Sequence, residues 1–102
     1  MNRYKLAKEM AYDLKTRFGD EISSIVLFGS VARHKENEES DIDLLIVSKK
    51  HLSKALDENI GKILMNGFVP EILNLTDAEF NKMKNLGSPL YYSIKDEGIK
   101  LC

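Results

Sequence analysis

The sequence predicts an α/β (α+β) fold, in which helices pack on a small mixed β-sheet. Apolar residues repeat every three or four positions in some segments, which is typical of amphipathic helices. Short runs rich in Ile, Val and Leu lie between those segments, and such runs are typical of strands. The chain has 102 residues, so we expect a single domain over residues 1–102. A domain of this size has room for one core but not for a roomy private cleft.

The expected elements follow one another along the whole chain. They are a helix over 6–18, strands over 22–28 and 41–47, a helix over 52–64, a strand over 68–75, helices that open at Thr76 and at Ser88, and a short last strand near 99–102. Gly19 ends the first helix, and Pro70 makes the third strand begin late or lie at an edge. Thr76 and Glu79 have the spacing of a capping box, and Pro89 suits the first position of a helix.

The lengths of the connections predict how the strands pair. Twelve residues, 29–40, join the first two strands, which is short for a crossover with a full helix and favours antiparallel pairing. A full helix joins the second and third strands, which favours a right-handed parallel crossover. We therefore expect Gly29–Ser30, Asp41, Asp43 and Glu71 to meet at one edge of the sheet.

Asp41 and Asp43 are two residues apart on a strand, so both side chains point to the same face. Two carboxylates on one face repel each other, and a cation between them reverses that interaction. Oxygen ligands without His or Cys nearby suit Mg²⁺, or Mn²⁺, better than zinc. Glu71 can add a third carboxylate if the strand register turns it to that face. The alternative is a polar start to a strand after the solvated loop "KENEES".

Gly29 and Ser30 form a turn at the end of the first strand. Glycine allows a positive φ and a close approach of the backbone to a ligand. Free backbone N–H groups at such a turn attract phosphates, and Arg33 can hold phosphate oxygens in a bidentate fork. The alternative is an ordinary Gly-Ser turn beside a solvated arginine.

Composition narrows the class of protein. The net charge is -1, so we expect no direct contact with nucleic acid. The one cysteine, Cys102, forms no internal disulfide, which indicates a reducing compartment. The charged N-terminus does not look like a signal peptide, and no apolar run is long enough to span a membrane. We expect a cytoplasmic protein.

Gly29–Ser30, ten residues and then Asp41-Ile42-Asp43 together resemble the signature of the DNA polymerase β-like nucleotidyltransferase superfamily. "GSVAR", "SDIDLLIV" and "SPLYYSIKDEGIKLC" resemble its smallest members, the minimal nucleotidyltransferases (MNT) encoded beside HEPN-domain proteins. The resemblance implies that Gly29 and Ser30 hold a nucleoside triphosphate, and that Asp41, Asp43 and Glu71 are catalytic residues that bind two Mg²⁺ ions.

The resemblance also implies a reaction and a partner. The expected reaction moves AMP from ATP to a hydroxyl, and relatives point to a tyrosine of a HEPN toxin. The chain would then be the antitoxin of a type VII-like toxin–antitoxin pair. Two alternatives stay open: a binding module that neutralises its HEPN partner by contact, and a transferase for a small molecule whose pocket forms in a homo-oligomer.

Overall fold

The computed structural model describes residues 2–32 and 41–102, with residues 30 and 31 as backbone only. The helices are α1 (Arg3–Phe18), α2 (Gly29–Ala32), α3 (Ser53–Met65), α4 (Asp77–Asn85) and α5 (Pro89–Glu97), with a 3₁₀ turn η1 at Gly19–Glu21. The strands are β1 (Ile22–Phe28), β2 (Ile42–Ser48), β3 (Pro70–Thr76) and β4 (Ile99–Lys100). The predicted order of elements is confirmed, with boundaries that differ by a few residues.

The four strands form one mixed sheet in the order β3-β2-β1-β4. β1 pairs antiparallel with β2, and β2 pairs parallel with β3, as the connection lengths predict. β3 is an edge strand and starts at Pro70, so the proline takes no ladder hydrogen bond away from a central strand. β4 is short and lies antiparallel to β1 at the other edge.

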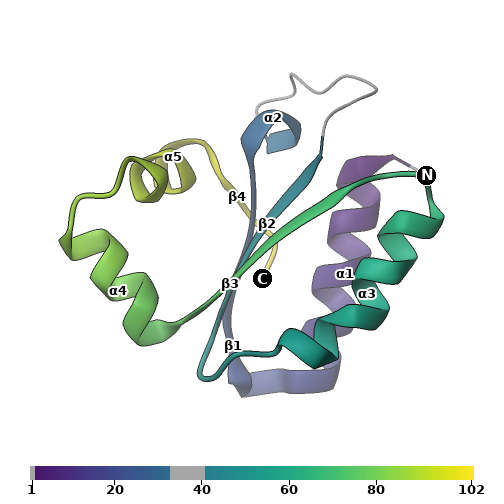
Figure 1. The fold of residues 1–102 in the computed structure, drawn as a ribbon, viewed down its shortest axis with the longest axis horizontal. Coiled ribbons are helices and arrows are strands. Elements are labelled where there is room, and N and C mark those ends of the chain that lie inside the picture. Colours follow the sequence, from purple (N-terminus) through teal and green to yellow (C-terminus); the bar gives the residue numbers. More distant parts are fainter. Residues whose placement is uncertain (1, 33–40) are drawn as a thin grey trace.

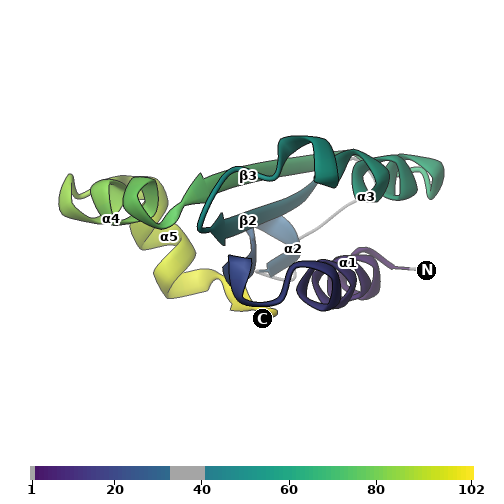
Figure 2. The ribbon, with the colours of Figure 1, turned by 90° about the horizontal axis from the view of Figure 1, so that it is seen from below.

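Helices cover both faces of the sheet. Figures 1 and 2 show α1 and α3 together on one side of the strands, and α4 and α5 on the other. The larger core cluster lies under α1 and α3 and includes Leu14, Ile25 and Leu44, none of them measurably exposed. The smaller cluster lies toward α4 and α5 and contains Leu45, Val47 and Ile94.

The central strand β2 is buried on both faces. Ile42, Leu44 and Ile46 point into the cluster under α1 and α3, as the alternation of side chains predicts. Leu45 and Val47 point the other way and are also buried, because α4 and α5 cover that face. Alternation along the strand predicts that one face of β2 is buried, and the structure buries both. Asp41 and Asp43 share the face of Leu45 and Val47 but lie at the start of the strand, where they are only half-buried.

A capping box begins α4. Glu79 N–H donates to Thr76 Oγ1 at 3.2 Å, and Thr76 N–H donates to Glu79 Oε1 at 2.9 Å. The bond from the Thr76 backbone is the main reason that the pKa of Glu79 lies below its usual range, and His51, whose Nε2 is 2.6 Å from Oε1, lowers it further. The cap therefore fixes the direction in which the chain leaves β3.

No helix in the described part of the chain is both long and apolar enough to cross a membrane.

The cap gives a first prediction. Thr76→Ala should lower the free energy of unfolding by about 1 kcal/mol, because the N–H of Glu79 loses its acceptor. Urea unfolding at neutral pH measures the change. Thr16→Ala is the control, since Thr16 is exposed within α1 and caps no helix. Equal losses in the two variants would contradict a capping role.

Candidate active site

The register of the sheet brings the acidic residues together. Asp43 lies opposite Phe28 on β1 and opposite Glu71 on β3. Residues paired across neighbouring strands point to the same face, so Glu71 and Asp43 are on one face. Asp41 precedes β2 and lies on that face as well, two residues from Asp43. The register therefore answers the question that the sequence leaves open for Glu71.

Asp41, Asp43 and Glu71 form a compact carboxylate group. One oxygen from each side chain lies within 4.8 Å of the others. Asp41 and Asp43 are half-buried, whereas Glu71 is exposed. Two unit negative charges at that separation repel by roughly 1 kcal/mol in bulk water, and by more where protein displaces water. A divalent cation would replace these repulsions by attractions.

The donor set fits a hard cation. All three side chains offer oxygen, and neither histidine nor cysteine from the described residues joins the group. Magnesium and manganese prefer such oxygen ligands, whereas structural zinc sites use nitrogen and sulfur. The residues present are therefore suited to hold Mg²⁺ or Mn²⁺.

Gly29 lies against one of these carboxylates. Its φ is +73°, in the left-handed region that favours glycine. A Cβ built on Gly29 would overlap Asp43 Oδ2 and would lie 3.0 Å from Asp43 Cγ. From the sequence, this glycine is predicted to allow a ligand to come close to the backbone; in the structure the Asp43 carboxylate is itself a close neighbour. The backbone of α2 begins at this residue.

The other two predicted nucleotide-binding residues are less fully described. The backbone of Ser30 belongs to α2, but its side chain lies outside the described part, as does Arg33. Their roles stay predictions. Of the residues that the sequence analysis assigned to the site, the structure brings together Gly29, Asp41, Asp43 and Glu71.

Comparison with known proteins places the chain in a family. Residues 7–101 match the family described as "Nucleotidyltransferase domain". The chain belongs to this nucleotidyltransferase family. A protein of Methanocaldococcus jannaschii named "putative protein adenylyltransferase" is 38% identical over 85 residues, which are 83% of this chain and 85% of that protein. The enzyme class expected from the Gly-Ser and Asp-x-Asp motifs is thus confirmed.

Solved structures share the fold. A toxin–antitoxin structure with AMP-PNP has a TM-score of 0.65 at 18% identity, covering 93% of this chain and 72% of that one. A structure of tri-AMPylated Shewanella oneidensis HEPN toxin in complex with MNT antitoxin has a TM-score of 0.56 at 18% identity, covering 96% and 71%. These likenesses confirm the predicted nucleotidyltransferase fold.

Gly29→Ala tests the contact between Gly29 and the carboxylates. The variant should lower the free energy of unfolding by about 1–2 kcal/mol for the left-handed backbone alone, and by more because the new methyl group displaces Asp43. Mn²⁺ uptake, followed by calorimetry or electron paramagnetic resonance, should weaken at the same time.

Gly67→Ala is the matched control for Gly29→Ala. Gly67 has a φ of +85° and open space where a Cβ would lie, so this variant carries the backbone cost without the overlap. If both variants lost the same stability and kept the same Mn²⁺ affinity, Gly29 would have no special relation to Asp43.

Proposed function

We propose that the chain is a magnesium-dependent adenylyltransferase that moves AMP from ATP to a tyrosine hydroxyl of a HEPN-domain partner, as an antitoxin. The observation that carries the proposal is the group formed by Asp41, Asp43 and Glu71 beside Gly29. The name of the Methanocaldococcus jannaschii relative and the HEPN toxin present beside the Shewanella oneidensis MNT antitoxin support the choice of reaction and partner.

The reaction balances without a covalent enzyme intermediate. The tyrosine oxygen forms a bond to the α-phosphorus of ATP, and the bond from that phosphorus to the bridging oxygen of the β-phosphate breaks. Pyrophosphate leaves with the electron pair, and the hydroxyl proton passes to solvent. Because no protein side chain needs to act as a nucleophile, the work of the chain is positioning and charge stabilisation.

The half-buried pair Asp41 and Asp43 would hold the divalent ions, and Glu71 would complete the group from β3. Bound there, the ions would lower the charge on the phosphates and favour an ionised acceptor oxygen. The backbone at the start of α2, next to Gly29, would lie along the triphosphate. These residues come from the end of β1 and the starts of β2 and β3, so the pairing of the three strands fixes their separation.

The exposed position of Glu71 supports a protein acceptor. Glu71 lies on an edge strand and its side chain is exposed, so one side of the carboxylate group is open to solvent. An acceptor as large as a folded partner can reach such an edge. A small acceptor would need further walls around the group. The two grooves seen among the described residues lie along α1, away from the carboxylates.

Asp43→Asn tests the reaction. With ATP, Mg²⁺ and a HEPN-domain partner protein, mass spectrometry should show one or more adenylyl groups added to that partner by the wild-type chain. Asp43→Asn should slow the addition by about 100-fold or more, because one charged ligand is lost. Asp57→Asn, an exposed carboxylate on α3, should leave the rate unchanged. Equal rates in both variants would refute a catalytic role for Asp43.

Neutralisation of the partner distinguishes catalysis from contact. The double variant Asp41→Ala, Asp43→Ala should fail to relieve growth arrest by the HEPN protein, while still co-purifying with it. Full relief by this variant would show that contact alone neutralises the partner and would overturn the adenylyltransferase proposal.

A further inference from the structure

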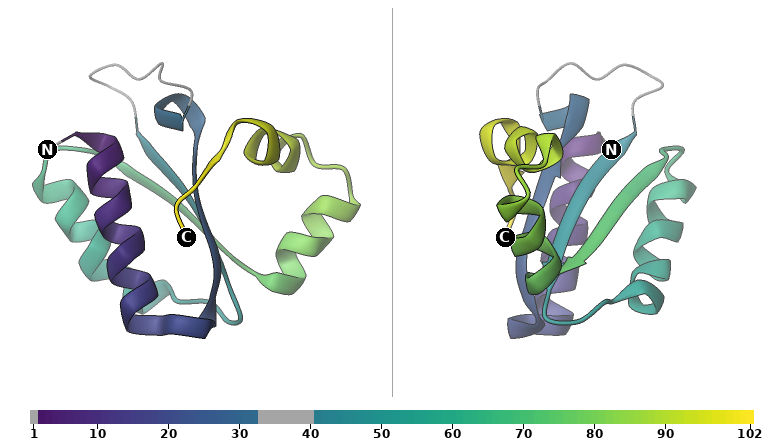
Figure 3. Two further views of the ribbon diagram at one scale, coloured as in Figure 1. Left: turned by 180° about the vertical axis from the view of Figure 1, so that it is seen from behind. Right: turned by 60° about the vertical axis from the view of Figure 1, so that its left-hand side comes forward.

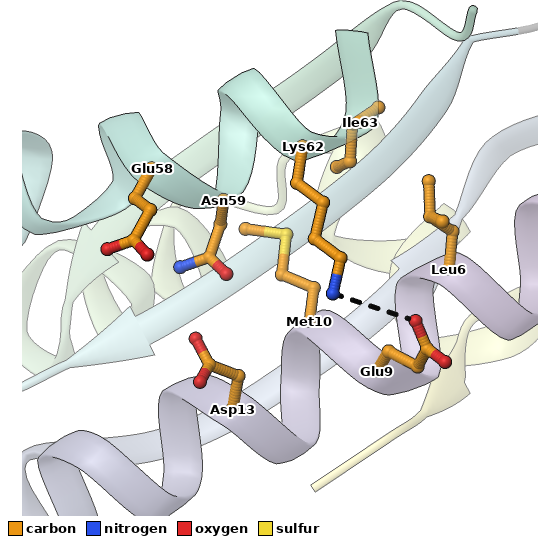
Figure 4. A pocket seen from close by; sticks show the side chains of 8 residues that line it. All are labelled: Leu6, Glu9, Met10, Asp13, Glu58, Asn59, Lys62 and Ile63. Carbon is orange, nitrogen blue, oxygen red and sulfur yellow. Dashed lines mark ion pairs between the residues drawn. The ribbon is translucent and has the colours of Figure 1, made fainter. Parts of the chain in front are cut away.

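The two flanks of α1 carry opposite charges. On the flank toward α3, Glu9 and Asp13 line a groove, and Figure 4 shows their carboxylates directed toward the neighbouring helix. Glu9 Oε2 lies 3.9 Å from Lys62 Nζ, and Asp13 Oδ2 lies 3.4 Å from a guanidinium nitrogen of Arg17. Both acids therefore form ion pairs with basic side chains. The opposite flank faces β4 and the end of the chain, and its side chains are lysines and tyrosines.

A second groove follows that flank. It has a volume of about 340 Å³ and is lined by Tyr4, Lys8, Tyr12 and Lys15 of α1 and by Lys100 of β4, together with small and apolar residues. Seen from behind, α1 and the end of the chain both lie in front of the sheet (Figure 3, left). Spacings of four, four and three residues place the four α1 side chains on one stripe. We call this surface the lysine–tyrosine groove.

The lysines of the groove are not neutralised by acidic side chains. None of the lining residues is Asp or Glu. Lys15 Nζ donates to the carbonyl oxygens of Gly19 and Ile22, both at 3.1 Å. Lys8 Nζ lies 5.3 Å from the centre of the Tyr4 ring. Within the described residues, neither Lys8 nor Lys100 forms an ion pair with a carboxylate. Lys15 is thus held by backbone carbonyls, and Lys8 and Lys100 supply two further positive charges along the groove.

The groove also presents an open aromatic ring. Tyr12 is 76% exposed, which leaves its ring uncovered. Tyr4 is 38% exposed, and Lys8 lies over its face. Tyr12 is therefore the side chain on which a flat ligand can stack.

We propose that the lysine–tyrosine groove binds single-stranded nucleic acid, with a base stacked on Tyr12 and phosphates near Lys8 and Lys100. Single-strand sites combine these two features, because every base has a face to stack and every nucleotide carries a negative charge. An acidic protein would meet the same charges, but lysine is depleted at the cores of protein interfaces. The stripe from Tyr4 to Lys15 is about 16 Å long, enough for two or three nucleotides.

This site is separate from the carboxylate group and does not depend on the proposed reaction. The expectation of no contact with nucleic acid came from the net charge of -1. That value is a sum over the whole chain, so it does not reveal that acidic and basic side chains lie on separate flanks of α1. The local separation of the charges carries the proposal.

Fluorescence anisotropy with labelled oligothymidylate and oligouridylate of about 12 nucleotides tests the site. For the wild-type chain, the logarithm of Kd should rise with the logarithm of salt concentration with a slope of about 1.4, since each of the two lysines placed at phosphates adds about 0.7. Lys8→Gln, Lys100→Gln should remove most of that slope and weaken binding at least about tenfold at low salt.

Two matched controls separate the groove from general charge and general aromatic effects. Lys82→Gln, Lys84→Gln removes the same charge from exposed positions on α4 and should change neither slope nor affinity. Tyr12→Ala should weaken binding about tenfold, as loss of one stacking platform does, whereas Tyr92→Ala on α5 should not. Thermal unfolding checks that all four variants remain folded, as substitutions of exposed side chains should.

Three results would overturn the proposal: equal losses in the two lysine pairs, no binding of either oligonucleotide at low salt, or a polyglutamate peptide that binds the groove more tightly than the oligonucleotides do. The last result would identify the groove as a surface for an acidic protein. Adenylyl transfer by the same variants is measured in parallel. A chain that loses oligonucleotide binding but keeps transfer separates the two sites.

Discussion

The register between β2 and its two neighbours is the constraint on which the candidate active site depends. Asp43 is paired with Phe28 on one side and Glu71 on the other. A shift of one residue in either ladder would turn Glu71 to the opposite face or move Gly29 away from Asp43. The register is held by burial, because Leu44, Leu45 and Ile46 are fully buried and alternate between two cores. The apolar centre of the strand thus positions the acids at its beginning.

Much of this arrangement was predictable, because short sequence signals determine it. Gly19 and the Thr76–Glu79 box mark helix ends, and Pro70 marks an edge strand. The length of the 29–40 connection separates antiparallel from parallel pairing, and the pairing then brings the carboxyl end of β1 to the amino ends of β2 and β3. This pairing brings the Gly-Ser motif, at the end of β1, next to the Asp-x-Asp motif at the start of β2.

Other features depend on contacts that no local pattern encodes. Alternation places Asp41 and Asp43 on one face, but only the pairing of β2 with β3 places Glu71 there. The burial of Leu45 and Val47 depends on α4 and α5, which follow much later in the chain. Gly29 is a common turn residue by sequence, and its closeness to Asp43 Oδ2 becomes visible only when the strands are paired. The charge separation across α1 requires knowing which flank faces α3 and which faces β4.

The position of the carboxylate group at a sheet edge also bears on the proposed transfer to a protein acceptor. Apolar side chains fill the central part of β2 on both faces of the sheet. The two aspartates lie at the start of that strand, and Glu71 is exposed on the edge strand β3. Under the proposed function, such an edge would hold the phosphates through Gly29 and the two aspartates, and its exposed side at Glu71 would be open to an acceptor. In this view the acceptor protein supplies the missing walls, and selectivity for it depends on shape around the edge. The chemistry would then be set by three strands of this chain and the choice of hydroxyl by the partner.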